Sequence, residues 1–162
     1  MDNTDKRILA ILKQDARFDS KTVATMLGLD SKDVANRIVA MQNEGIIVKY
    51  TTVVNNELLE SDCVVALIEV RVTPQTNHGF DFIAHEIMNY KEVSSVYLMS
   101  GAYDLVVIVE GKNLKEVSSF VSEKLSIMQN VISTSTHFIL KKYKSEGVVL
   151  DNSNDKQREV MA

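Results

Sequence analysis

Polar side chains between positions 21 and 49 have the types and spacing that contacts with DNA require. Arg37 can hold a phosphate or make a bidentate contact with guanine, and the neighbouring Asn36 could address adenine. Hydroxyl and ammonium groups around them suit contacts with phosphate oxygens. We therefore expect a DNA-contacting set made of Lys21, Thr22, Ser31, Lys32, Asn36, Arg37 and Lys49.

Two crossing helices are predicted to position this set. Ala24 is small enough for a close crossing, Gly28 suits the left-handed turn that ends a helix, and Val34 would lock the second helix against the first. This arrangement is typical of a helix-turn-helix, whose second helix enters the major groove. Taken alone, however, the same pattern also occurs in many helical bundles.

Residues 5–48 as a whole predict three short helices, because apolar residues recur there at helical spacing. The β-rich run at 46–54 predicts a strand or wing after them. Residues 1–55 are thus expected to form a winged helix-turn-helix. Each helix is preceded by candidate capping residues, which are Asp2 or Thr4, Asp19 or Ser20, and Asp30 or Ser31.

Charge is divided unevenly along the chain. The 162 residues carry a net charge of −4, yet residues 1–55 hold eight Lys and Arg against seven Asp and Glu, whereas residues 56–162 hold ten against fifteen. The first third is therefore the only plausible place for a polyanion site, although it is weakly basic. So sparse a site predicts weak binding by a monomer, and dimerisation would double the contacts.

The second half follows a different pattern after a short polar linker at residues 56–62. Residues 63–143 predict the order β-α-β-β-α-β, which is ferredoxin-like, with parallel crossover pairs of strands and both helices on one face. Residues 144–162 are expected to be a polar, solvated extension, so the fold class is α+β. The second helix of this half should bury a stripe formed by Leu114, Val117, Val121, Leu125 and Met128.

The turn from Gly101 to Asp104 could bind the zwitterion of an amino acid. Asp104 would face the ammonium group, and backbone amides near Gly101 would face the carboxylate. Thr134 and Thr136 fall on one face of the last strand and would add hydroxyl groups. A plain β-turn with ordinary strand threonines explains the same residues and is favoured by composition alone.

Short motifs along both halves occur in the order typical of one regulator family. The chain resembles the leucine-responsive regulator/AsnC (feast/famine) transcription factors from about Asp2 to Tyr143. The motifs are Asp5-Lys6-Arg7-Ile8-Leu9, Asp15-Ala16-Arg17, Val23-Ala24-x-x-Leu27-Gly28-Leu29, Asn36-Arg37-Ile38, Glu44-Gly45-Ile46-Ile47, Val93-x-x-Val96-Tyr97, Ser100-Gly101-Ala102-Tyr103-Asp104 and Val131-x-x-Thr134-x-Thr136.

The resemblance implies a transcription regulator that binds double-stranded DNA as a dimer, with dimers often assembling into octamers. It also implies an effector pocket between dimers for an amino acid or a related small metabolite, with no other cofactor. Tyr97, Met99 and Ser100, next to the turn, would determine which ligand side chain the pocket accepts. The expected ligand set is Tyr97, Met99, Ser100, Gly101, Ala102, Tyr103, Asp104, Thr134 and Thr136.

The chain departs from the family's usual residues at four places. Asp30 stands where the family usually has Ser, and Asn36 precedes Arg37 where it usually has two adjacent Arg. These two changes remove positive potential from the DNA face and bear on affinity and operator preference. The other two departures are Met41-Gln42 in place of Leu-Glu and Leu59-Glu60 in place of Leu-Gly.

Two rival functions remain open. A stand-alone amino-acid-sensing or protein-interaction module that has lost DNA binding would account for the weakly charged second helix. An RNA-binding domain shares the ferredoxin-like sheet, but the chain lacks the Gly/aromatic strand signature that stacks bases.

Catalysis, metal binding and membrane insertion find little support. His78, His85 and His137 share no metal-ligand spacing with one another or with Cys63, and the chain has no phosphate loop or nucleophile elbow. No apolar stretch is long enough for a membrane helix, and the polar start is unlike a signal peptide. The single cysteine, Cys63, is expected to be a small buried hydrophobe in a cytoplasmic protein.

Overall fold

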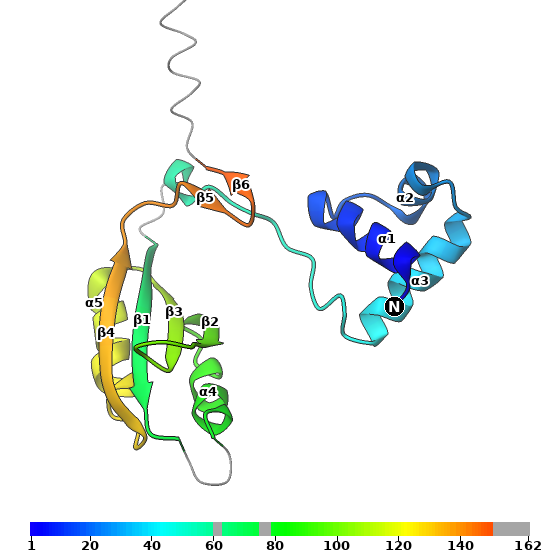
Figure 1. Cartoon of the computed structure of the whole chain (residues 1–162). Coiled ribbons are helices and arrows are strands. Elements are labelled where there is room, and N and C mark those ends of the chain that lie inside the picture. The colour runs from blue at the N-terminus through cyan, green and yellow to red at the C-terminus, as the bar shows by residue number, and fades with distance from the viewer. Residues whose placement is uncertain (60–62, 75–78, 151–162) are drawn as a thin grey trace, which may run out of the picture. The chain divides into compact units, whose positions relative to one another are not determined.

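The chain divides into two compact units, Met1–Val53 and Val54–Ala162. The computed structural model describes residues 1–59, 63–74 and 79–150 (Figure 1). Each unit has its own cluster of buried apolar side chains. The helical first unit and the mixed second unit confirm the predicted α+β class.

Three helices form the first unit. Aspartate caps all of them, because the carboxylates of Asp2, Asp19 and Asp30 accept hydrogen bonds from amides of the first turn. Such a cap typically contributes about 1 kcal/mol. Asp2 and Asp5 also accept from each other's backbone N–H, which makes a capping box. The helices are α1 (Asn3–Gln14), α2 (Ser20–Leu27) and α3 (Ser31–Asn43).

A tight turn joins α2 to α3 (Figure 1). Gly28 ends α2 with a φ of 68°, in the left-handed region that strains residues with a side chain. The backbone N–H of Leu29 then donates to the carbonyl of Ala24 at 3.0 Å. This geometry confirms the predicted turn between the two crossing helices.

The three helices pack around a small apolar core, but the predicted wing strand is wrong. Residues 46–54 contain no strand, and Val48 is 86% exposed. The described part of the first unit offers this β-rich segment no neighbouring strand to pair with, and a single strand satisfies none of its own backbone groups. The buried core residues are Ile8, Leu12, Val23, Ala24, Val34 and Met41.

A four-stranded antiparallel sheet forms the centre of the second unit, in the order β2-β3-β1-β4. Each pair of strands linked through a helix runs in the same direction, but another strand lies between its members. The predicted parallel crossover pairs are therefore correct in direction but are not hydrogen-bonded neighbours. The elements are β1 (Val64–Val72), α4 (Asp81–Met88), β2 (Val93–Leu98), β3 (Leu105–Gly111), α5 (Leu114–Phe120), a π-helical turn η2 (Val121–Leu125) and β4 (Val131–Ile139).

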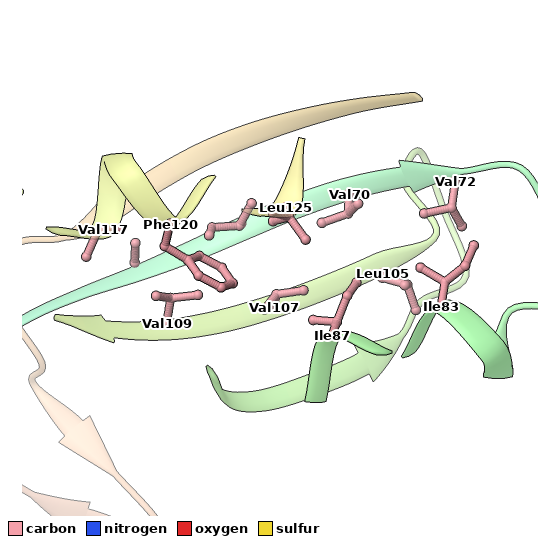
Figure 2. Close-up of a cluster of buried hydrophobic side chains, with 12 residues drawn as sticks. Val70, Val72, Ile83, Ile87, Leu105, Val107, Val109, Val117, Phe120 and Leu125 are labelled. Carbon is pink, nitrogen blue, oxygen red and sulfur yellow. The ribbon is translucent and has the colours of Figure 1, made fainter. Parts of the chain in front are cut away.

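The core of the second unit lies between the sheet and its two helices. Figure 2 shows Ile83 and Ile87 of α4 beside Leu105 of β3, and Phe120 of α5 beside Val109 of the same strand. Since both helices contribute to one cluster, both cover the same face of the sheet, as the ferredoxin-like pattern requires.

The helix formed by α5 and η2 departs from the predicted apolar stripe at its first position and in its middle. Leu114 is 56% exposed, whereas Phe120, which lies outside the stripe, is 2% exposed. The π-helical turn η2 brings Phe120 and Leu125, which are five residues apart, into the same core, because such a turn changes the spacing at which side chains return to it. Gly111 allows the close start of α5, since a Cβ there would lie 2.9 Å from Cγ2 of Val117.

Residues 144–150 are not a solvated extension, contrary to the prediction. Lys144–Ser145 (β5) and Val148–Val149 (β6) pair as a short antiparallel hairpin. The side-chain amide of Asn55, just before η1 (Asn56–Leu58), donates to the carbonyl of Leu150 at 2.9 Å. Residues 151–162, including the expected end of the extension, lie outside the described residues.

Candidate nucleic-acid interface and effector cleft

The surface of the first unit carries the predicted DNA-contacting residues. On α3, Lys32 and Asn36 lie on the side opposite the buried Val34 and Met41, whereas Ser31 and Arg37 flank the buried side. Others lie in the first turn of α2 and in the segment after α3. Six of the seven predicted residues are exposed or half-buried with no ion pair among the described residues, namely Lys21, Thr22, Ser31, Lys32, Asn36 and Lys49.

Arg37 differs from these six because three carboxylates hold its guanidinium group. Its Nη1 lies 2.7 Å from Oδ2 of Asp2 and 2.9 Å from Oδ1 of Asp5. Its Nε donates to Oδ2 of Asp33, one turn earlier on α3, at 3.0 Å. Arg37 therefore ties α3 to the N-terminus of α1, and its predicted contact with DNA stays a prediction.

The same ion cluster shifts the acidity of its members. The backbone N–H of Asp5, followed by the guanidinium of Arg37, lowers the pKa of Asp2 to about 2. The backbone N–H of Asp2 and then Arg37 lower the pKa of Asp5 as well. Hydrogen bonds with these carboxylates, that of Asp2 first, raise the pKa of Arg37. Asp2, Asp5 and Arg37 are therefore all charged at neutral pH.

Val39 is a surface residue of α3 that the sequence analysis did not select. Its side chain is 52% exposed, although the residue is apolar. Spacing could have found it, because positions 32, 36, 39 and 43 recur at helical intervals on the side opposite Val34 and Met41.

In the second unit, a cleft of about 190 Å³ lies beside the turn between β2 and β3. It brings together three of the predicted ligand residues, which are Ala102, Tyr103 and Thr134. Four further residues line it that the sequence analysis did not select as ligands, which are Glu69, Arg71, Ser133 and Ser135. The sequence feature that could have pointed to Glu69 and Arg71 is their outward alternation at the end of β1.

The remaining predicted ligand residues do not line this cleft. Asp104 is half-buried, and its Oδ2 accepts a hydrogen bond from the backbone N–H of Val72 at 2.9 Å, where the pairing of β1 with β4 shifts register. Thr134, which does line the cleft, shares a hydrogen bond with Ser126, with the two hydroxyl oxygens 3.2 Å apart. The other residues outside the lining are Tyr97, Met99, Ser100, Gly101 and Thr136.

A larger and shallower depression, of about 1030 Å³, occupies the opposite end of the sheet. Glu92 lines it but is already paired, since its Oε1 lies 2.7 Å from Nζ of Lys124. None of the predicted ligand residues lies there, so we place the candidate effector site in the smaller cleft. Cys63, which also lines the depression, is exposed and not buried as predicted.

Neither a metal-binding cluster nor a membrane span is present among the described residues. Within residues 1–59, 63–74 and 79–150, no group of three His, Cys, Asp or Glu side chains is placed to hold a metal ion. Every helix in the same ranges is too short or too polar to cross a bilayer.

A capped helix-turn-helix unit followed by an α+β unit with a polar cleft defines a class of protein: DNA-binding regulators with a separate ligand-binding domain. The comparisons with known proteins assign the family. Residues 1–42 match the AsnC-type helix-turn-helix domain, and residues 65–149 match the Lrp/AsnC ligand binding domain. The chain belongs to the Lrp/AsnC family.

Named relatives agree with this assignment. The chain is 41% identical to the HTH-type transcriptional regulator YugG of Bacillus subtilis (strain 168) over 159 residues, which cover 98% of this chain and 96% of that protein. It is 30% identical to the HTH-type transcriptional regulator FL11 of Pyrococcus furiosus, with 89% and 92% of the two chains covered.

Solved structures agree in fold. The E. coli AsnC structure has a TM-score of 0.70 at 21% identity and covers 90% of this chain and 95% of that one. The complex of the regulator NMB0573 from Neisseria meningitidis with L-Met has a TM-score of 0.72 at 21% identity, with coverage of 90% and 93%. The predicted family, fold and regulatory function are confirmed, and this chain is a transcriptional regulator and not an enzyme.

Proposed function

We propose that the chain binds double-stranded DNA as a homodimer through the outer surface of α3, and that an amino acid or a related small metabolite modulates this binding. The observation that carries the DNA part is the exposed polar surface of α3, which the capped turn at Gly28 fixes against α2. Half-sites should lie about one helical turn apart, near 10 bp, or a multiple of it.

Gel shift with the chain's own promoter at low salt tests the DNA part. Replacing both Lys32→Gln and Asn36→Ala should weaken binding about tenfold or more, because a phosphate contact and a base contact are lost. Lys115→Gln, an exposed lysine of α5 in the second unit, is the matched control and should bind like the wild type. Equal binding by all three proteins would show that α3 is not part of the DNA interface.

The alternative is a sensing module without DNA binding. The observation that favours it is the cluster around Arg37, where three carboxylates offset the larger of the two cations on α3. No retarded band at low salt, with either the promoter or random genomic fragments, would support this alternative.

The effector part rests on the charges of the cleft. Glu69 and Arg71 lie two residues apart on one face of β1, so the cleft offers a carboxylate for an ammonium group and a guanidinium for a carboxylate. Its volume of about 190 Å³ is below that of drug-sized pockets, which are roughly 300–1,000 Å³. A free amino acid fits both properties, and the L-Met complex of NMB0573 supports this class of ligand.

Calorimetry of the full chain against the twenty amino acids tests the effector part. Arg71→Gln should abolish the heat of any amino acid that binds, because the carboxylate loses its charged partner. Arg17→Gln, in the first unit, is the matched control. No heat with any amino acid would contradict the proposal. If Arg71→Gln gives the same heat as the wild type, the effector site is not in this cleft.

The surface proposed for dimerisation is the sheet face that α4 and α5 leave uncovered, which would pack against the same face of a second copy. Leu67 and Ile108 lie opposite each other on that face and are half-buried, next to the buried Val106. Ile108→Glu should shift the full chain toward monomer in sedimentation velocity.

We also propose that dimers can assemble further, to octamers. The protein would act in the cytoplasm with no cofactor besides its effector.

A further inference from the structure

The outer stripe of α3, defined as Lys32, Asn36, Val39 and Asn43, contains one apolar side chain. At 3.6 residues per turn these four positions fall on the side of the helix opposite Val34 and Met41. Val39 is 52% exposed, in the middle of this otherwise polar stripe. Its methyl groups would therefore face the molecule that binds to the outer stripe.

Arg37 does not belong to the outer stripe. Its guanidinium group is directed to the N-terminus of α1, where Asp2 and Asp5 hold it at 2.7 and 2.9 Å. A bidentate contact with guanine through Nη1 and Nη2 would compete with both of these ion pairs, and Nε is held by Asp33. The groups of the outer stripe are available without such a rearrangement.

An exposed valine is not unusual by itself, since folded proteins leave many apolar atoms at their surface. The position of Val39 is what distinguishes it, because it lies one turn after Asn36 on the helix that enters the groove. In the major groove, thymine presents its C5-methyl group, and apolar side chains make contact with it. Asn36 would pair with adenine in the same groove, so both side chains favour A·T pairs.

We propose that Val39 is a specificity-determining residue that contacts a thymine methyl group, while Arg37 positions α3 without touching the bases. The inference rests on the proposed DNA binding through α3. It predicts operators whose half-sites place an A·T pair under the third turn of α3.

The test begins with the full-length protein and a random double-stranded DNA library, from which bound sequences are selected. Each conserved thymine of the selected site is then replaced by uracil, which lacks the C5-methyl group, and binding is measured for the wild type, Val39→Ala and Val39→Thr. Met26→Ala is the matched control, because Met26 is an apolar residue of α2 with a similar exposed fraction, 53%.

One thymine per half-site should show the effect. There, uracil should weaken wild-type binding about fourfold, as expected for one buried methyl group at ~0.8 kcal/mol. Val39→Ala should bind the thymine site more weakly and be insensitive to uracil, whereas Val39→Thr, which keeps one methyl group, and Met26→Ala should retain the wild-type preference.

The outcomes separate this inference from the proposed function. Failure to select any DNA would overturn the proposed DNA binding itself. Selected sites at which uracil costs Val39→Ala as much as it costs the wild type would overturn the inference alone. Unchanged DNA binding by Val39→Ala together with a change in its sedimentation would assign Val39 to a protein contact instead.

Discussion

At the scale of single residues, the ion cluster around Arg37 links the fold of the first unit to its surface charge. Asp2 caps α1, completes a capping box with Asp5 and pairs with Arg37. One side chain thus holds both the helix start and the contact between α1 and α3. With three carboxylate partners, the guanidinium of Arg37 holds α1 and α3 together and is less available to bind phosphate.

The pKa of Asp2 predicts how acid affects this unit. Because its folded value of about 2 is below the ordinary 3.8, the unfolded chain takes up the proton first. The stabilisation is therefore complete above about pH 4 and is lost as the pH falls toward 2. In thermal melts followed by circular dichroism, Asp2→Asn should remove part of this acid dependence while keeping a good cap. A variant with the same pH profile as the wild type would contradict the assignment.

Asp104 offers a second prediction at this scale, because its carboxylate has a structural partner. Asp104→Ala would leave the backbone N–H of Val72 without its acceptor and should cost about 1–3 kcal/mol in urea denaturation. Asp104→Asn keeps an acceptor oxygen and should cost less. If Asp104→Asn nonetheless loses amino-acid binding while its stability is retained, the carboxylate contacts the ammonium group, as the sequence analysis predicted.

At the scale of elements, the turn between α2 and α3 depends on one backbone conformation. Gly28→Ala should destabilise the protein by about 1–2 kcal/mol, because an L residue is strained at a φ of 68°. Gly28→Asn should cost less, since asparagine tolerates the left-handed region. Denaturant titration of both variants checks the order, and equal stabilities would show that the turn relaxes.

The sequence predicted those elements whose causes are local. The helix caps and the left-handed Gly28 depend on residues within one turn: of each pair of capping candidates the aspartate forms the cap, and the conformation of Gly28 was predicted correctly. The wing strand was wrong because pairing needs a neighbour that the sequence pattern cannot supply. The partners of Arg37 were missed for a similar reason, since Asp2 and Asp5 lie 35 and 32 residues away along the chain.

The effector cleft was predicted only in part for the same reason. The turn at Gly101–Asp104 is visible as a sequence motif, but the cleft also needs β1 and β4, which the sheet brings beside it. Glu69 and Arg71 were recognised as outward residues of a strand. Their place in the cleft follows from strand register, which sequence alone does not fix.

At the scale of the whole molecule, uneven charge predicts a modest salt dependence of DNA binding. Residues 1–55 carry one excess positive charge, and the rest of the chain is acidic. In a dimer, each lysine that contacts phosphate occurs twice, so Lys32→Gln should reduce the slope of log K against log salt by about two. Lys115→Gln should leave the slope unchanged. Gel shifts at four or more salt concentrations measure both slopes, and equal slopes would exclude a phosphate contact by Lys32.

The widened turn at Val121–Leu125 has a consequence for how this chain is aligned with its relatives. A π-helical turn accommodates one more residue than an α-helical turn over the same stretch. A relative with a one-residue gap here can therefore keep equivalents of Phe120 and Leu125 in place by reverting to regular pitch. Such a gap would record a local change of winding, and homologues that carry it need not differ in core or in ligand.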